Sequence, residues 1–253
     1  MATVLETIGL KKTYMQGKVP VHALRGVDFK VEKGELISIL GPSGSGKSTL
    51  LNLIGALDKP TEGSIIVNGQ DISRMNKNEL AEIRQDVGFV FQYFNLIGRL
   101  NALKNVELPM NIKGLSGKDR KKKATGLLEL VGLGNRIKHK PNELSGGQQQ
   151  RVAIARALAQ EPKFLLMDEP TGNIDTKTRD SILELVKRLN KEKNITVIII
   201  THDPYIANIT NRTVYIVDGV LYTNEEEATK AELNHRGLVS LQDEKMQPEE
   251  VQT

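Results

Sequence analysis

Apolar and polar positions alternate along the first part of the chain. Residues 4–8 (VLETI) and 24–31 (LRGVDFKV) alternate roughly with a period of two, which is typical of antiparallel strands with one buried face. Residues 35–40 (ELISIL) form a short, largely apolar strand that leads directly into a glycine-rich loop. Residues 48–57 then predict a helix and residues 64–67 a further strand. The pattern therefore predicts an amino-terminal antiparallel sheet followed by a strand, a loop and a helix.

From about residue 95 to residue 144 the pattern becomes helical and rich in leucine and lysine. Residues 119–131 predict a helix with a basic face and an apolar end. We interpret the run at residues 120–123 (RKKK) as a solvated helix face rather than a nucleic-acid contact. This stretch is expected to form an inserted helical subdomain at about residues 95–145.

Helix and strand patterns alternate in the rest of the chain. Residues 164–167 and 196–200 are apolar and β-branched enough to form buried parallel strands. Residues 178–189 predict a helix between these strands. This strand–helix–strand order favours an α/β fold.

Composition and charge add further constraints. The chain has 253 residues and contains no cysteine, which excludes disulfides and cysteine metal sites. The longest apolar run is far shorter than the about 20 residues of a membrane-spanning helix, so none is expected. Residues 225–253 carry eight acids and three bases, whereas residues 1–224 carry a net charge of +9. A basic body favours nucleotides, nucleic acid or anionic lipid as partners, or is simply a solvated surface.

A phosphate-binding loop is predicted where the strand at residues 35–40 ends. The pattern G-x-x-x-x-G-K-[ST] is matched by Gly41, Pro42, Ser43, Gly44, Ser45, Gly46, Lys47, Ser48 and Thr49. Its glycines let backbone N–H groups turn toward phosphate oxygens, and the following helix adds a partial positive charge. Lys47 is expected to reach the β- and γ-phosphates and Ser48 to bind Mg²⁺.

Two carboxylates end the strand at residues 164–167. Asp168 is expected to hold Mg²⁺, because ligands of open α/β sheets bind beyond the carboxyl ends of the strands. Glu169 follows directly, so its side chain is expected to point elsewhere, where it can act as general base on the attacking water. Two acids at a strand end that simply meet solvent are the alternative interpretation.

A second glycine motif precedes another predicted helix, at residues 148–159. It consists of Leu144, Ser145, Gly146, Gly147 and Gln148. Ser145 is a natural helix cap, and consecutive glycines let a phosphate approach the backbone. One nucleotide does not need two such loops from one chain. We therefore expect two chains, each lending this motif to the γ-phosphate bound by the other.

With this L-S-G-G-Q motif, the chain up to about residue 222 resembles the nucleotide-binding subunits of the ABC (ATP-binding cassette) family. The resemblance implies a P-loop NTPase core with a mixed sheet, an amino-terminal antiparallel β subdomain and the inserted helical subdomain. It places the ABC ATPase domain at residues 1–224 and leaves residues 225–253 as an acidic tail of unassigned role. The ligands that it implies are ATP and Mg²⁺.

The resemblance also implies roles for four further residues. Tyr14 is expected to stack on adenine, and Gln92 to contact Mg²⁺ and the attacking water. His202 is expected to sense the γ-phosphate, and Asp175 to join the two halves of the dimer. Ile174 precedes Asp175 where the family more often has leucine, which is a mild departure.

The resemblance implies a dimer of two copies on the cytoplasmic face of the membrane. The expected partner is an integral membrane permease, and nucleic acid is not expected as a partner. Residues 54–63, 91–97 and 168–173 resemble the subgroup that serves lipoprotein release, macrolide export and antimicrobial-peptide resistance. A force transmitter of the cell-division type, an importer and a soluble ABC ATPase of DNA repair or translation remain alternatives. A GTP switch is disfavoured, because the nearest approach to N-K-x-D, at residues 76–79, ends in glutamate.

Overall fold

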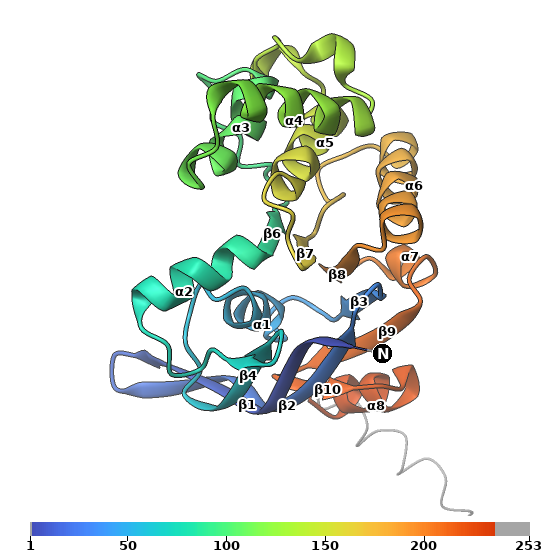
Figure 1. Cartoon of the computed structure of the whole chain (residues 1–253). Helices are drawn as coiled ribbons and strands as arrows, with labels where there is room; N and C mark the ends of the chain where they lie inside the picture. The colour runs from blue at the N-terminus through green and yellow to red at the C-terminus, as the bar shows by residue number, and fades with distance from the viewer. Residues whose placement is uncertain (1, 236–253) are drawn as a thin grey trace, which may run out of the picture.

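The computed structural model describes residues 2–235, which Figure 1 colours along the chain. The strands are β1 (Thr3–Gln16), β2 (Val19–Glu32), β3 (Leu36–Leu40), β4 (Glu62–Val67), β5 (Gln70–Asp71), β6 (Val87–Val90), β7 (Phe164–Asp168), β8 (Thr196–Thr201), β9 (Arg212–Val217) and β10 (Val220–Tyr222). The helices are α1 (Lys47–Ile54), α2 (Lys77–Ile83), α3 (Ala102–Ile112), α4 (Gly117–Leu130), α5 (Gly146–Leu158), α6 (Thr176–Lys193), α7 (Pro204–Ala207) and α8 (Glu225–His235).

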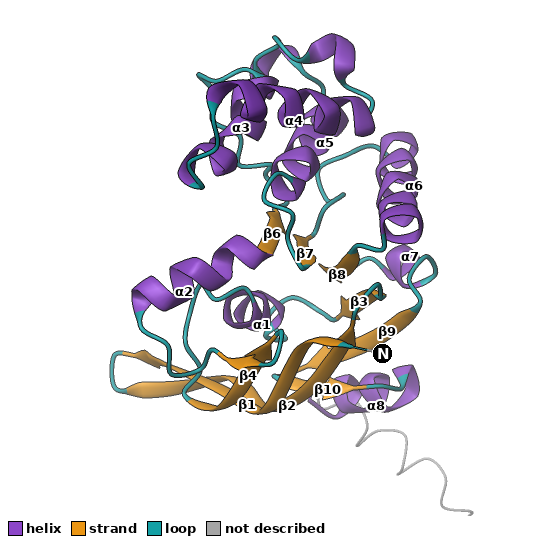
Figure 2. Cartoon of the chain, viewed as in Figure 1, coloured by secondary structure: helices purple, strands orange, loops and turns teal. Residues whose placement is uncertain are grey.

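The strands form two sheets (Figure 2). One sheet is antiparallel, with the order β2-β1-β4-β5. The other has the order β10-β9-β3-β8-β7-β6; its strands are parallel except β10, which pairs antiparallel with β9. The antiparallel sheet, the mixed sheet and the helices confirm the predicted α/β fold class.

The central strands of the mixed sheet are buried on both faces, as expected of parallel strands covered by other layers. Along β7 the side chains alternate between two hydrophobic clusters. Phe164 and Leu166 join the cluster shared with α1 and the antiparallel sheet. Leu165 and Met167 join the cluster shared with α3, α4, α5 and α6. The mixed sheet is therefore the layer that ties the two hydrophobic clusters together.

The helices α3, α4 and α5 lie together at the top of Figure 1, away from the antiparallel sheet. Each of the helices α4, α5 and α6 begins at a side chain that accepts a backbone N–H: Ser116, Ser145 and Asp175, respectively. Helix α1 ends at Ile54, three residues earlier than the sequence pattern predicts. Gly55 follows it, and Ala56 has a left-handed backbone (φ 56°), so the helix cannot continue.

The first part of the acidic tail is ordered. Residues 225–235 form α8, which packs against β9 and β10 at the bottom of Figure 1. The tail was expected to be either loosely ordered or one helix; its remainder, residues 236–253, lies outside the described residues. Between residues 2 and 235, no helix has the length and apolar character needed to span a membrane.

Candidate nucleotide site

The loop between β3 and α1 adopts a backbone that requires glycine. Gly44 and Gly46 have left-handed φ angles of 83° and 102°. A Cβ atom on Gly46 would also lie 2.5 Å from the carbonyl oxygen of Ala23. The strand, loop and helix thus follow one another in the order that the phosphate-loop motif demands.

Lys47 lies at the start of α1 and closes this loop. Its Nζ donates to the carbonyl oxygens of Gly41 at 2.7 Å and Pro42 at 2.8 Å. Burial lowers the pKa of Lys47, and the nearby charges of Glu169 and Asp168 act in the opposite direction. The ammonium group is therefore already held over the loop and faced by two carboxylates.

A cavity of about 500 Å³ opens beside the loop. It is lined by thirteen residues from five parts of the chain: Val21, His22, Ala23, Ser43, Gly44, Gly46, Lys47, Ser48, Thr49, Gln92, Asp168, Glu169 and His202. This set unites the phosphate loop with all four polar residues expected to act on water and Mg²⁺. Gly41, Ser45 and Tyr14, also expected to bind nucleotide, do not line the cavity.

Both acids at the end of β7 face the same cavity. The expectation that Glu169 points elsewhere than Asp168 is wrong in this respect. The backbone of Glu169 is left-handed, with φ 44°, and this breaks the alternation of side chains along the strand. Burial, and then the charge of Glu169, raises the pKa of Asp168. The charge of Lys47 opposes this shift, so two carboxylates and one ammonium group share the strand end.

Glu169 is held by the last residue of β8 and by the residue that follows it. Its Oε2 accepts a hydrogen bond from Thr201 Oγ1 at 2.9 Å, and its Oε1 accepts one from the backbone N–H of His202 at 2.9 Å. Nδ1 of His202 lies 2.6 Å from the same Oε1. With Glu169 ionised, this bond places a proton on Nδ1. The carboxylate is thereby fixed in one orientation, with the imidazole beside it.

Gln92 lies between the acidic strand end and the inserted helices. Its backbone oxygen accepts from Asn173 Nδ2 at 3.2 Å, and a Cβ on Gly172 would lie 2.8 Å from Gln92 Nε2. Two left-handed residues follow it closely, Phe94 (φ 58°) and Asn95 (φ 50°). The turn after Gln92 is therefore strained and must be held by other parts of the chain.

Arg156, on α5, holds this turn. Its guanidinium donates to the carbonyl oxygens of Asn95 at 2.6 Å and Phe94 at 3.0 Å. Burial lowers the pKa of Arg156, which nevertheless remains charged. The helix that begins with the second glycine motif is thus bonded to the turn after Gln92.

The residues expected to hold Mg²⁺ fit that ion chemically. Ser48, Gln92 and Asp168 supply hydroxyl, amide and carboxylate oxygens on one cavity, the hard ligands that Mg²⁺ takes together with phosphate. Burial and the charge of Glu169 raise the pKa of Asp168, and a bound cation would act against both effects.

Tyr14 lies at the margin of the cavity rather than in its wall. Its hydroxyl donates to Asp58 Oδ2 at 3.1 Å, and Lys12 Nζ lies 4.9 Å from the ring centre. Burial raises the pKa of Tyr14, while its hydrogen bond with Thr49, a wall residue, lowers it. Adenine stacking on Tyr14 therefore stays a prediction, supported by this proximity.

The second glycine motif lies outside this cavity, at the start of α5. Ser145 Oγ accepts from the backbone N–H of Gln148 at 3.4 Å, and Gln148 Oε1 accepts from the N–H of Ser145 at 3.0 Å. This reciprocal cap confirms the predicted helix start. A Cβ on Gly147 would lie 2.1 Å from Thr178 Cγ2, so glycine is required where α5 meets α6.

Asp175 has a local role that the sequence did not indicate. Its Oδ1 accepts from the backbone N–H of Thr178 at 3.1 Å and so caps α6. Hydrogen bonds from Thr178 lower the pKa of this exposed carboxyl. Its expected role in joining two chains remains a prediction.

Sequence reasoning missed several residues around the cavity. Val21, His22 and Ala23 line it from β2, on the strand that pairs with the Tyr14 segment. The ring of His22 is bonded to Thr13 through Nδ1 at 3.0 Å. Within β1 and β2 the sequence pattern predicted strands at residues 4–8 and 24–31, so it did not indicate that residues 21–23 lie beside Tyr14.

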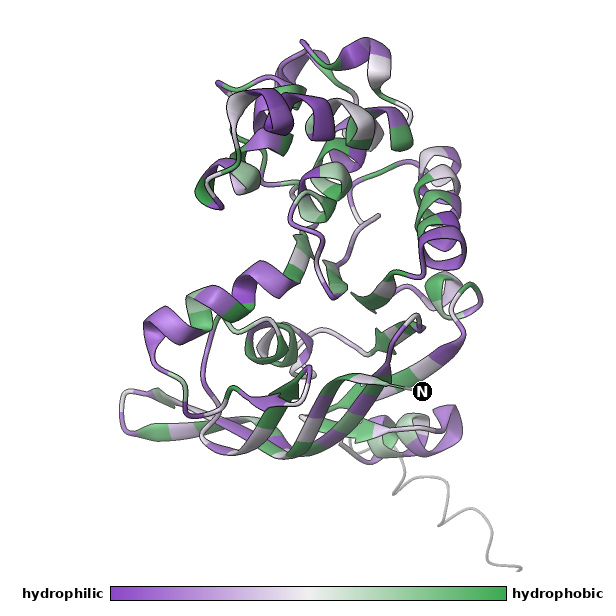
Figure 3. Cartoon of the chain, in the orientation of Figure 1, coloured by the Kyte–Doolittle hydropathy of each residue, from purple (hydrophilic) through white to green (hydrophobic). Residues whose placement is uncertain are grey.

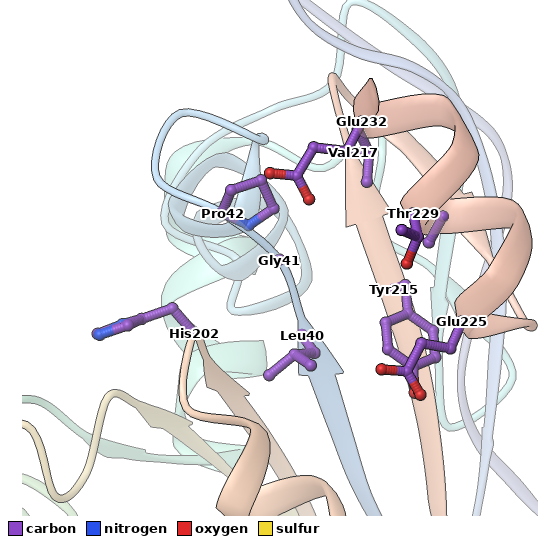
Figure 4. A pocket seen from close by; sticks show the side chains of 10 residues that line it. Leu40, Gly41, Pro42, His202, Tyr215, Val217, Glu225, Thr229 and Glu232 are labelled. Atoms are coloured by element: carbon purple, nitrogen blue, oxygen red, sulfur yellow. The ribbon is translucent and has the colours of Figure 1, made fainter. Parts of the chain in front are cut away.

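A second cavity of about 250 Å³ lies between α8 and the phosphate loop (Figure 4). Gly41 and Pro42 border it on one side, and Tyr215 and Glu225, whose side chains are bonded at 3.3 Å, on the other. Figure 4 shows the His202 imidazole pointing away from α8. Gly41 and Pro42, whose carbonyl oxygens accept from Lys47, therefore lie across this second cavity from α8.

Comparisons with known proteins agree with this site. A family model described as ABC transporter matches residues 24–172. An uncharacterized ABC transporter ATP-binding protein of Thermotoga maritima is 54% identical over 220 residues, 87% of this chain and 94% of that protein. The lipoprotein-releasing system ATP-binding protein LolD of Geobacter metallireducens is 46% identical over 220 residues, 87% of this chain and 98% of LolD.

Solved structures give the same result. The ATP-binding cassette MJ0796 of Methanocaldococcus jannaschii, in a dimeric post-hydrolysis state bound to ADP and Pi, matches with a TM-score of 0.79 and 47% identity. The match covers 86% of this chain and 96% of that one. The chain therefore belongs to the ABC transporter family and is an ATP-hydrolysing cassette of that family.

Proposed function

We propose that this cassette works as a head-to-tail dimer of two copies, closing around two ATP molecules to drive a membrane permease. The observation that carries the dimer is the separation of the two glycine motifs. Ser145, Gly146, Gly147 and Gln148 form a helix start, but none of them lines the cavity of their own chain. A helix start of this kind suits an anion, and the γ-phosphate held by a second copy is that anion. The dimeric state of the MJ0796 cassette supports the same arrangement.

In this proposal each wall residue has one role in hydrolysis. Lys47 exchanges the carbonyls of Gly41 and Pro42 for phosphate oxygens. Glu169 accepts the proton of the attacking water, and His202 contacts the γ-phosphate while keeping the carboxylate oriented. Mg²⁺, when bound by Ser48, Gln92 and Asp168, would neutralise phosphate charge. Positioning and charge stabilisation then supply most of the acceleration.

A groove of about 370 Å³ on the cassette is the proposed permease site. It is mostly apolar and is lined by Leu57, Arg84, Val87, Gly88, Phe89, Phe91, Pro109, Arg156, Ala157 and Gln160. Phe91 stacks on Phe89 with ring centres 5.7 Å apart and directly precedes Gln92. Arg156 both lines the groove and holds the turn after Gln92. A nucleotide-dependent movement of Gln92 would therefore displace a permease segment bound in this groove.

This partner places the cassette at the cytoplasmic face of the membrane as a peripheral subunit. The similarity to LolD over nearly its whole length supports a task in lipoprotein release or a related export process. The division into an ATPase domain at residues 1–224, with a helical subdomain at about 95–145, belongs to the same proposal. Helices α3 and α4 are the ones that would carry motion from Gln92 to the permease.

The dimer is tested with the variant Glu169→Gln, by size-exclusion chromatography with light scattering. We expect a monomer without ATP and a dimer with ATP, because the uncleaved γ-phosphate continues to bridge the two copies. A matched variant, Glu169→Gln with Ser145→Arg, should bind ATP and remain monomeric, because the blocked motif belongs to the partner's site. A monomer of Glu169→Gln with ATP demonstrably bound would contradict self-closure.

The groove is tested with Leu57→Asp, whose side chain is 47% exposed. We expect it to lose co-purification with the permease from native membranes while the ATPase activity of the isolated cassette stays unchanged. The control is Val19→Asp, at an exposed apolar position of the β1–β2 hairpin (63% exposed). If both variants retain the permease equally, the groove is not the docking site.

A further inference from the structure

The positive charge of the chain is concentrated in the helical region. Residues 95–145 contain eleven lysines and arginines but only four acids, a net formal charge of +7. The whole chain carries only +4. This region therefore presents a strong local field of one sign, which attracts anionic partners.

Helix α4 concentrates this charge on one face. Lys118, Lys121 and Lys122 are spaced by three and four residues and are all exposed. Figure 3 shows α4 as a largely hydrophilic helix at the outer end of the molecule. Among the described residues no ion pair is formed by these three lysines, whereas Lys123 on the adjacent face pairs with Glu161 at 2.6 Å. Asp119 is the one acid in the first turn of α4, so the helix carries a clear excess of positive charge.

An exposed apolar side chain closely precedes this helix in the chain. Ile112 ends α3 and is 73% exposed, and Lys113 follows it in the turn that leads to α4. Arg120, on α4, holds the turn between the two helices by donating to the carbonyl oxygen of Leu115. Lysines around a projecting apolar residue combine electrostatic attraction with shallow insertion, as in proteins that rest on bilayer surfaces.

The same turn borders the groove proposed for the permease. Lys113 Nζ donates to the carbonyl oxygen of Gln160 at 3.1 Å, and Gln160 lines that groove together with Pro109 of α3. A permease segment in the groove would therefore have the turn beside it.

We propose that Ile112, Lys113, Lys118, Lys121 and Lys122, the basic surface, bind the anionic headgroups of a phospholipid bilayer. Phosphate-bearing headgroups would supply the direct anionic partner that Lys118, Lys121 and Lys122 lack among the described residues. The basic surface would set the tilt of the cassette against the membrane, a contact additional to the permease. The expected tilt of the cassette depends on the proposal that the permease binds in the groove. The expected affinity of the basic surface for lipid does not depend on it.

The test is co-sedimentation of the whole chain with vesicles of phosphatidylcholine, with and without phosphatidylglycerol. We expect binding only to the phosphatidylglycerol vesicles, and weaker binding as salt is raised. The variant Lys121→Glu/Lys122→Glu should weaken it by at least about 30-fold, since one lysine near an anionic surface contributes about fivefold. Ile112→Ser should cause a loss that depends less on salt.

The matched control is Lys191→Glu/Lys193→Glu, which makes the same charge change at exposed positions on α6. It should retain vesicle binding, and all variants should retain the unfolding temperature and ATP hydrolysis of the parent. Equal binding to both vesicle types, equal losses in the two double variants, or tighter binding to a DNA duplex than to the vesicles would each overturn the proposal. Because no permease is present in this assay, its failure would leave the groove proposal intact.

Discussion

Nδ1 of His202 lies 2.6 Å from Oε1 of Glu169, so the imidazole and the carboxylate at the ends of two neighbouring strands act as one unit. Thr201 and the backbone N–H of His202 complete the hydrogen bonding of the carboxylate. Residues that act as a unit give non-additive losses when they are removed together. This relationship makes the site testable by single and paired substitutions.

Glu169→Gln should leave ATP binding intact and remove most hydrolysis. The amide is nearly the same size as the carboxylate but cannot accept the proton of water, and the loss of a general base costs about 10²–10⁴-fold. Steady-state turnover measures this. The double variant with His202→Ala should lose no more than about the single Glu169 variant. Turnover equal to wild type in Glu169→Gln would remove this residue from the mechanism.

Lys47→Ala should prevent tight ATP binding. Its ammonium group is expected to exchange two carbonyl partners for phosphate oxygens, and a hydrogen bond to a charged group contributes about 1.5–3 kcal/mol. The dissociation constant for ATP, measured by titration calorimetry, should rise by about 10- to 150-fold. Lys191→Ala on α6 is the control for general loss of positive charge. An unchanged affinity would contradict the phosphate-loop assignment.

Asp168→Asn should stabilise the nucleotide-free protein and abolish Mg²⁺-dependent hydrolysis. Burial raises the pKa of Asp168, so the folded state holds this proton more tightly than the unfolded chain does. Tighter binding of the proton adds to the free energy of unfolding. This contribution is complete below the ordinary aspartate pKa and is lost as pH rises through the raised pKa of the folded protein. Asparagine does not titrate, so the stability of the variant relative to that of the parent should rise with pH over that window.

Thermal unfolding at about pH 4 and at about pH 7 measures this difference, since the two values lie near and above the ordinary aspartate pKa. The unfolding temperature of the variant should exceed that of the parent only at the higher pH. The same gain at both pH values would show that the effect of asparagine has nothing to do with titration.

Arg156→Lys should uncouple the turn after Gln92 from α5. One ammonium group cannot reproduce the planar fork that bonds the carbonyls of Phe94 and Asn95. We expect a loss of about 1–3 kcal/mol in unfolding free energy and a fall in kcat that exceeds any change in ATP affinity. A variant that is destabilised but turns over ATP normally would give Arg156 a purely structural role.

His22→Ala should raise the KM for ATP and leave kcat unchanged. The ring lines the cavity, and its bond to Thr13 through Nδ1 leaves Nε2 for the nucleotide. One neutral hydrogen bond contributes about 0.5–1.5 kcal/mol, which is about a two- to tenfold change in KM. Lys18→Ala, in the hairpin turn, is the control. A KM equal to that of wild type would place His22 outside the nucleotide contacts.

Local signals in the sequence predicted much of the fold and site. The phosphate loop ties a strand, a turn and a helix together within residues 36–54, and the apolar β-branched runs identify β7 and β8. Caps such as Ser145 are visible in the sequence because a helix start is a local event.

Features that depend on tertiary contacts or on one unusual backbone angle were not predictable. The left-handed φ of Glu169 has no sequence signature, since glutamate rarely adopts it. Arg156 meets Phe94 across 62 residues of sequence, and His22 lines the cavity through the register of a twisted hairpin. The early end of α1 likewise depends on how Ala56 is packed, which composition does not reveal.

The close approach of Gly147 to Thr178 fixes a spacing on which several parts of the cassette depend. Helix α5 carries Arg156 at its far end, and α6 begins at Asp175, so a single methyl group at Gly147 would displace one helix from the other. The turn after Gln92 and the surface expected to meet a second copy would shift together. Because Gly147 has no side chain, α5 and α6 pack closely at this point. A small displacement of one helix is therefore passed to the other.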